Sequence, residues 1–180
     1  MKPGFMSGDY LINLDSEDEG QLFVSCAGGV RTEATYTVEE VQLPEGFSTF
    51  NFVVKGLTGG HSGDDINKNR ANANKLLVRF LLEQCEKTDL RLCDIQAGGL
   101  HNAIPREAHA TVAVPTAYAA TFVTELEAFV AKVREEFSAT EPDLTAALEA
   151  ADAASTCICP EQAVRMLKSL SVVHNGIFAM

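Results

Sequence analysis

One histidine in a glycine-rich run is the side chain of this sequence best placed to do chemistry. His61 lies within Gly-Leu-Thr-Gly-Gly-His-Ser-Gly-Asp, residues 56–64, which follows a predicted strand at 48–56 and precedes a predicted helix at 65–86. Glycines permit backbone angles closed to other residues and leave few bulky neighbours to block a ligand. The helix N-terminus expected beside the run would favour a carboxylate or a developing oxyanion. A glycine-rich turn with an incidental histidine is the alternative.

A second stretch with chemical potential is Gly-Gly-Leu-His-Asn-Ala-Ile-Pro-Arg-Glu at residues 98–107, between two further alternating segments. Ile104 precedes Pro105, and proline disfavours the helical region for the residue before it, so the backbone there should be extended. Asn102 can then offer an amide donor and a carbonyl acceptor at a defined place. Asparagine and proline between strands are also ordinary turn residues, so this stretch alone fits a structural turn as well.

An acidic turn near the start of the chain is a candidate for metal binding. Asp15 follows the apolar segment Tyr-Leu-Ile-Asn-Leu at 10–14 and opens the run Asp-Ser-Glu-Asp-Glu-Gly. A carboxylate at a strand end suits a metal ligand, since the strand fixes it while the loop leaves one side open to the ion. A solvated acidic turn is the plainer alternative. A calcium-binding EF-hand loop is rejected because Cys26 stands where its final glutamate is required.

Taken together, the motifs resemble those of the aminoacyl-histidine dipeptidases. The resemblance is carried by the glycine-rich run, by Ala-Asn-Ala-Asn-Lys-Leu-Leu at 71–77 and by Asn-Ala-Ile-Pro-Arg-Glu-Ala at 102–108. It extends from Asp9 to about Ile177 and is strongest over 56–111. These enzymes, also called peptidase D or cytosol non-specific dipeptidase, belong to the two-zinc exopeptidases. The resemblance implies that this chain is the lid, or dimerisation, domain of a zinc-dependent hydrolase that cleaves dipeptides, either those ending in histidine or a broad range.

The resemblance also implies a role for one residue of each motif. Asp15 matches a zinc ligand, His61 matches a lid histidine that stabilises the transition state, and Asn102 matches a lid asparagine that binds substrate. The implied cofactors are two Zn²⁺ in the full-length enzyme, with none bound by this fragment. In the resembled family the other ligands and the general base lie outside the matched segment, and no two of the four histidines here have metal-ligand spacing. The isolated chain is therefore expected to be inactive.

Composition and charge narrow the class of protein. With 180 residues and 46% hydrophobic content, the chain can bury a core without disulfides. A net charge of −11 argues against nucleic acid and anionic membrane as partners, and no apolar run approaches the roughly 20 residues of a membrane span. Five cysteines, an odd number, favour free thiols in a reducing cytoplasm. The expected partners are a dipeptide substrate and a second lid, either in a homodimer or as a second module of the same chain.

The elements that must position these residues follow from apolar periodicity and turn residues. The order β-α-β-β-α-β after an N-terminal hairpin predicts an α+β, ferredoxin-like fold, an antiparallel sheet with both helices on one face. Thr116 is the expected N-cap of the second helix, and Pro160 suits the first turn of a short closing helix. Residues 1–20 are expected to end a catalytic domain and residues 21–180 to form the lid or dimerisation domain. The predicted elements are a hairpin at 21–26 and 31–41, strands at 48–56, 90–97, 107–114 and 143–151, and helices at 65–86, 116–138 and 160–170.

Two other classes of function remain open from the sequence. In the first, the chain is a stand-alone dimerisation module whose glycine-rich turn only shapes a surface; a gene of this length would favour that function. In the second, it is a ferredoxin-like sensor with His61 and Asn102 lining a small-ligand pocket. Tight stoichiometric binding of amino acids or dipeptides to the isolated chain would favour the sensor.

Overall fold

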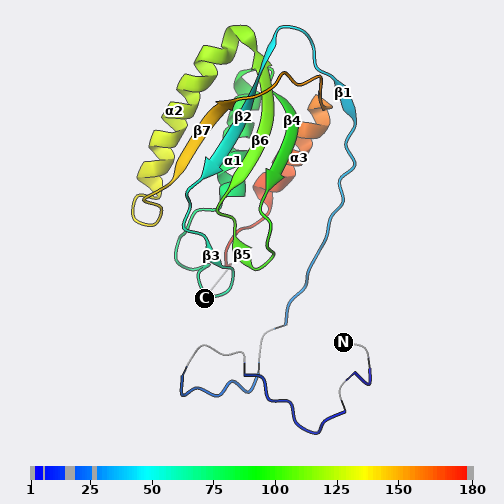
Figure 1. Ribbon diagram of the computed structural model, residues 1–180, viewed down its shortest axis with the longest axis vertical. Coiled ribbons are helices and arrows are strands. Elements are labelled where there is room, and N and C mark those ends of the chain that lie inside the picture. The colour runs from blue at the N-terminus through cyan, green and yellow to red at the C-terminus, as the bar shows by residue number, and fades with distance from the viewer. Residues whose placement is uncertain (1–2, 6, 15–18, 26–27, 178–180) are drawn as a thin grey trace. The chain divides into compact units, whose positions relative to one another are not determined.

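The computed structural model describes residues 3–5, 7–14, 19–25 and 28–177, and it divides into two units, Met1–Thr35 and Tyr36–Met180. The first unit has neither helix nor strand within its described residues, and its apolar side chains there are exposed. All the helices and strands that the described residues form lie in the second unit (Figure 1). The second unit therefore contains the elements that position both motifs.

The second unit is built on a four-stranded antiparallel sheet with the order β4-β6-β2-β7. In chain order these strands are β2 (Phe47–Lys55), β4 (Arg91–Ala97), β6 (Ala108–Pro115) and β7 (Thr145–Ala150). With a helix after β2 and another after β6, this order is the ferredoxin-like arrangement, so the predicted α+β fold is confirmed.

Two long helices cover one face of this sheet. Helix α1 (Ala73–Lys87) follows β2, and helix α2 (Ala119–Glu136) follows β6 after a short 3₁₀ turn, η1 (Thr116–Tyr118). A third helix, α3 (Pro160–Val172), starts with proline in its first turn, as predicted, and packs against α1. None of the helices in the described part of the chain is long and apolar enough to cross a membrane.

An aromatic cluster between the sheet and the two helices forms the centre of the core. The ring of Phe80 on α1 lies 4.9 Å from that of Phe52 on β2, 5.5 Å from that of Phe122 and 5.1 Å from that of Phe129, both on α2. Burying Phe52, Phe80 and Phe122 completely removes large apolar surfaces from water, which is the main driving force for assembly of this layer. The apolar stripes predicted for both helices therefore belong to the core.

The N-terminal hairpin predicted from 21–26 and 31–41 is not formed by the described residues of those segments. Only the end of its second arm is a strand, β1 (Glu40–Gln42), and β1 pairs antiparallel with β8 (Thr156–Ile158). An isolated two-stranded hairpin is only marginally stable in water. Strand β8, by contrast, leads directly into α3 and so offers β1 an anchored partner.

The first helix begins eight residues later than predicted. Residue Asn69 has a left-handed backbone with φ of +53°, which no helix can continue through. The Asn72 side chain then accepts hydrogen bonds from the backbone N–H groups of Asn74 and Lys75 and caps α1. Because of this shift, the glycine-rich run does not lead directly into the helix, and the helix start predicted at residue 65 is wrong. Thr116, the N-cap predicted for the second helix, contacts Ser48 instead and lies in η1.

Candidate functional site

The sheet brings the two motifs together. Strands β2 and β4 both run antiparallel to β6, so the loops that follow them emerge at the same end of the sheet. Within these loops, β3 (Gly60–His61) pairs with β5 (Ala103–Ile104), and the Ser62 N–H donates to the Asn102 carbonyl at 2.9 Å. Figure 1 shows β3 and β5 side by side below the sheet. The predicted site residues His61 and Asn102 are therefore neighbours at one tip of the domain.

The ring of His61 is oriented by its own loop. Its Nδ1 accepts hydrogen bonds from the backbone N–H groups of Gly63 at 3.1 Å and Asp64 at 3.3 Å. An Asp64 carboxylate oxygen also lies 3.3 Å from Nδ1, but that contact would require a proton on the nitrogen. Two donors aimed at Nδ1 favour the tautomer that carries its proton on Nε2. The His61 side chain is 52% exposed, so its Nε2–H group is available to donate a hydrogen bond to a ligand or domain that covers this tip.

The backbone of the same loop is fixed by the partly exposed carboxylate of Asp65. Asp65 accepts a hydrogen bond from the His61 N–H at 2.7 Å. The ammonium group of Lys68 donates to the other Asp65 oxygen at 2.7 Å, and the Arg70 guanidinium lies 3.3 Å from the carboxylate. The Lys68 hydrogen bond, followed by that of the His61 amide, holds the pKa of the Asp65 carboxyl below its ordinary value. Asp65 is therefore ionised at neutral pH and restrains the histidine from its backbone side.

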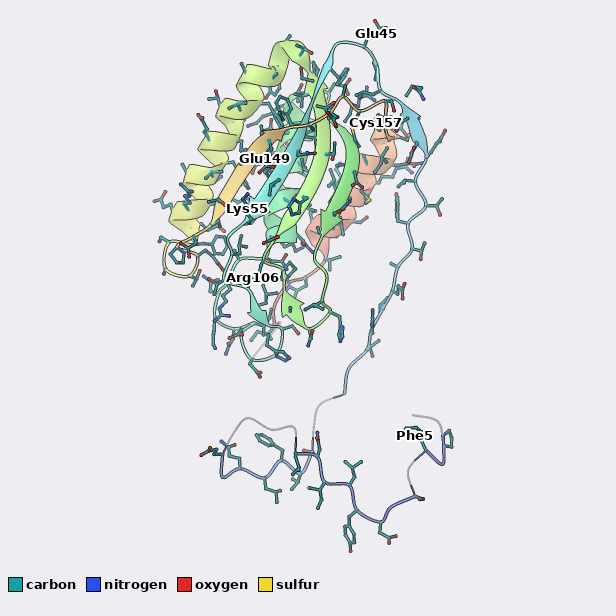
Figure 2. The ribbon with its side chains drawn as sticks, in the orientation of Figure 1. Phe5, Glu45, Lys55, Arg106, Glu149 and Cys157 are labelled. Atoms are coloured by element: carbon teal, nitrogen blue, oxygen red, sulfur yellow. The ribbon has the colours of Figure 1, made fainter. Side chains whose placement is uncertain are left out.

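Two of the glycines are required by close packing. Gly59 has φ of +65° and Gly60 has φ of +137°, both in the region that favours glycine. A Cβ at Gly59 would overlap the Arg106 side chain, and one at Gly60 would overlap Arg70 and Asp65. Arg70 donates to the Gly59 carbonyl, and Arg106 belongs to the second motif at the same end of the sheet (Figure 2). The glycine-rich run thus lets the side chains of Arg70 and Arg106 pack directly against its backbone.

The second motif is anchored on the C-terminal side of Asn102. Arg106 Nε donates to the Leu57 carbonyl at 3.0 Å, and the Pro105 carbonyl accepts the Ala73 N–H at 3.0 Å. Ile104 lies in β5, which confirms the extended backbone predicted before Pro105. The Asn102 side chain is exposed and makes no hydrogen bond within the described part of the chain. Its amide can therefore bind a ligand from a fixed backbone position.

A buried carboxylate that sequence reasoning missed completes the support of this tip. Glu141 is 3% exposed and accepts the backbone N–H groups of Thr58 at 2.6 Å and Ala71 at 2.9 Å. It lies in the loop before β7, which is antiparallel to β2, so that loop meets the one following β2. Both partners are 70 or more positions away in sequence, so no local pattern could have indicated the contact.

The described residues do not make a metal centre. Asp15, the predicted zinc ligand, lies outside the described residues. Within the described ranges, no three His, Cys, Asp or Glu side chains gather closely enough to hold a metal ion. A structural or catalytic zinc ion takes three or four protein ligands, so this part of the chain does not fit a two-zinc site.

The cysteines of the described residues are free thiols, as predicted, and they do not suggest a nucleophile. Burial raises the pKa of the Cys85 and Cys93 thiols to about 11, so both are protonated at neutral pH. Burial also raises the pKa of Cys157.

Comparison with known proteins agrees with the geometry. A family profile described as the peptidase dimerisation domain of the M20 group matches residues 46–141. The chain is 36% identical to the cytosol non-specific dipeptidase of Escherichia coli (strain K12) over 177 residues, which are 98% of this chain and 36% of that protein. Among solved structures, the aminoacylhistidine dipeptidase from Vibrio alginolyticus matches with a TM-score of 0.78 and 34% identity, over 81% of this chain and 30% of that one. The chain thus spans about a third of the length of these relatives.

Proposed function

This chain belongs to the peptidase dimerisation domain family of the M20 peptidases, and we propose that it is the lid of a dipeptidase, in which His61 stabilises the transition state and Asn102 binds substrate. The observation that carries the proposal is the pairing of β3 with β5, which puts both residues at one exposed tip. The similarity to two dipeptidases supports the class of reaction. Sequence reasoning arrived at the same two residues from motifs alone.

The proposed role of His61 follows from the charge that peptide hydrolysis develops. Attack of water on the scissile carbonyl places negative charge on the carbonyl oxygen, and a donor already in position stabilises that charge. The His61 ring has its Nδ1 occupied by two backbone amides, which leaves Nε2–H as the outward donor. Removing one such donor raises the barrier by about 2.7–4 kcal/mol in other acyl-transfer enzymes.

The proposed role of Asn102 is to bind the dipeptide before charge develops. An asparagine amide can donate to a carbonyl or carboxylate and accept from an N–H group. The backbone of Asn102 is tied to the His61 loop by the hydrogen bond from Ser62, so both contacts would be made by one rigid unit. Asn102 should therefore affect ground-state affinity more than turnover.

The remaining parts of the proposal concern the complete enzyme. We propose that residues 1–20 end its catalytic domain, that residues 21–180 form the lid, and that Asp15 is one of the ligands of two Zn²⁺ held mainly by other parts of that enzyme. Zinc ions in hydrolases supply an activated water and polarise the carbonyl. A second lid, in a homodimer or in the same chain, and a dipeptide are the proposed partners. Closure of the lid over the substrate would exclude water from the reacting groups.

A small-ligand sensor is the competing function, and two cavities formed by the described residues do not favour it. One cavity of about 240 Å³ lies on the open face of the sheet and is lined by Asn51, His109 and their neighbours. Another of about 300 Å³ lies between α1 and the end of α3. Neither encloses His61 with Asn102, whose tip is open to solvent, as expected of a site completed by another domain.

Steady-state kinetics of the complete enzyme test the proposal. His61→Ala should lower kcat and kcat/KM together by about 10²–10³-fold, because the lost interaction forms only in the transition state. Asn102→Ala should mainly raise KM. His109→Ala is a matched control, since its side chain is 51% exposed against 52% for His61 and lies on the open face of the sheet. Wild-type kcat in His61→Ala, with normal folding by circular dichroism, would refute the proposed site.

A further inference from the structure

We propose that Glu141 is a positioning residue for His61, because its buried carboxylate fastens both ends of the loop that carries the histidine. The inference rests on the proposed function of His61 and extends it to a residue that lies outside both motifs. Glu141 oxygen Oε2 accepts the Thr58 N–H at 2.6 Å, and Oε1 accepts the Ala71 N–H at 2.9 Å. Between these two amides the chain makes the whole excursion over residues 59–70, which contains β3.

The two hydrogen bonds of Glu141 to the Thr58 and Ala71 amides, here called the clamp, require a carboxylate. Each Glu141 oxygen is an acceptor, so one side chain can bind two separate N–H groups, of which that of buried Ala71 would otherwise lack a partner. The side chain is 3% exposed, and no cation lies within ion-pair distance of it among the described residues. A glutamine at this position has one oxygen, and its NH₂ group would face one of the two amides. Only one end of the loop could then be held.

Neighbouring hydrogen bonds of Thr140 hold the same two parts of the loop as the clamp does. The Thr58 hydroxyl donates to the Thr140 carbonyl at 2.8 Å, and the Thr140 hydroxyl donates to the Asn69 carbonyl at 3.1 Å. Residues 140–141 thus hold the loop at its beginning and near its end. Asn69, the residue with the left-handed backbone, is one of the groups they fix.

Movement of residues 140–141 would be transmitted to the histidine. The ring of His61 is bound to the amides of Gly63 and Asp64, and its backbone is bound to Asp65, so ring and loop form one unit. Releasing either end of the loop would displace that unit relative to the substrate. A misplacement of about 1 Å in a reacting geometry can cost about 10²-fold in rate. Glu141 would therefore act on turnover without touching the substrate.

A double-mutant cycle in the complete enzyme tests the proposal. Glu141→Gln should lower kcat by about 10–100-fold and change KM by less than about threefold. In the His61→Ala background the same substitution should change kcat by less than about twofold, because it acts through the histidine. Glu149→Gln is the matched control: it makes the same chemical change on β7, where Glu149 pairs with Lys55 at the surface (Figure 2). This control should keep wild-type kcat.

The outcomes separate this inference from the proposed function. If His61→Ala lowers kcat but Glu141→Gln does not, or lowers it equally in both backgrounds, Glu141 does not position the histidine. If His61→Ala itself leaves kcat unchanged, the proposed function fails first. Should Glu141→Gln not fold, Glu141→Asp keeps the carboxylate but shortens the side chain by one methylene, so that it can no longer reach both the Thr58 and the Ala71 amides. A fall in kcat that vanishes in the His61→Ala background would support the clamp, and an unchanged kcat would overturn it.

Discussion

At the scale of single residues, His61 owes its orientation to backbone groups of its own loop. The amides of Gly63 and Asp64 bind Nδ1, and Asp65 binds the His61 N–H. These contacts come from residues within four positions of the histidine, so the motif carries most of its own geometry. The local geometry of the motif therefore does not depend on the helix expected beside it, which begins eight residues later.

The state of Asp65 gives a prediction for the dependence of this loop on pH. The pKa of Asp65 is lowered in the folded chain, so its contribution to loop stability is present above the ordinary aspartate pKa of about 3.9 and is lost as the pH falls through the lowered value. The protection of the His61 amide from hydrogen exchange, taken relative to its intrinsic exchange rate at the same pH, should therefore fall on acidification below about pH 4. Asp65→Asn should exchange rapidly at neutral pH and lose most of this dependence. Identical pH profiles for the two proteins would show that Asp65 does not restrain the loop.

Glu141 shows what sequence reasoning could not find at this scale. It stands between a helix end and a proline, where a glutamate is usually a solvated charge, yet it is buried beneath the loop after β2. Its burial follows from the antiparallel pairing of β7 with β2 and not from any local pattern. Contacts that depend on which strands are neighbours become visible only in the folded chain.

At the scale of elements, apolar periodicity predicted both ends of each of the four strands of the sheet to within two residues. In β2, every second side chain belongs to the core because one face of the strand packs on the helices. Strands β3 and β5 are two residues each and too short to show any period, so their pairing was not predicted. The expected N-terminal hairpin was wrong: among its described residues only the end of the second arm forms a strand, and that strand pairs with β8 instead of with the first arm.

The start of α1 gives a prediction about stability. Asn72 caps the helix by accepting the N–H groups of Asn74 and Lys75, so Asn72→Ala should lower the free energy of unfolding by about 0.5–2 kcal/mol. Urea denaturation of the chain would measure this. Thr124→Ala, on the exposed surface of α2, removes a β-branched residue from a helix interior and should be neutral or slightly stabilising. Equal losses in the two variants would argue against a specific cap.

At the scale of the whole molecule, the ferredoxin-like unit supplies a rigid platform with both motifs at one end. The core lies between the sheet and the two helices, away from the tip that carries His61 and Asn102. The fold itself was predictable because its order of strands and helices follows from local periodicity. What would complete the site was not, because under the proposed function most metal ligands and the general base would lie in other parts of the complete enzyme.

Because the proposed site is shared between this domain and other parts of the complete enzyme, the behaviour of the 180-residue chain by itself can be predicted. It should neither hydrolyse dipeptides nor retain two zinc ions, because its described residues hold no cluster of metal ligands and Asp15 supplies one ligand where three or four are needed. Elemental analysis after dialysis against zinc-free buffer would measure this, with the complete enzyme as the positive control. Two tightly bound zinc ions per chain that disappear in Asp15→Ala would contradict the proposed arrangement.

The central claim, that His61 binds charge developing in the transition state, is tested most directly by the affinity for a phosphinic dipeptide analogue. Such a compound carries a tetrahedral anion where the peptide carries a planar carbonyl, so its affinity reports the contact that hydrolysis would use. Calorimetry on the complete enzyme should show a loss of about 10²–10³-fold in His61→Ala, matching the loss in kcat/KM, and less than about twofold in His109→Ala. Wild-type affinity in His61→Ala, with zinc content unchanged, would contradict the account.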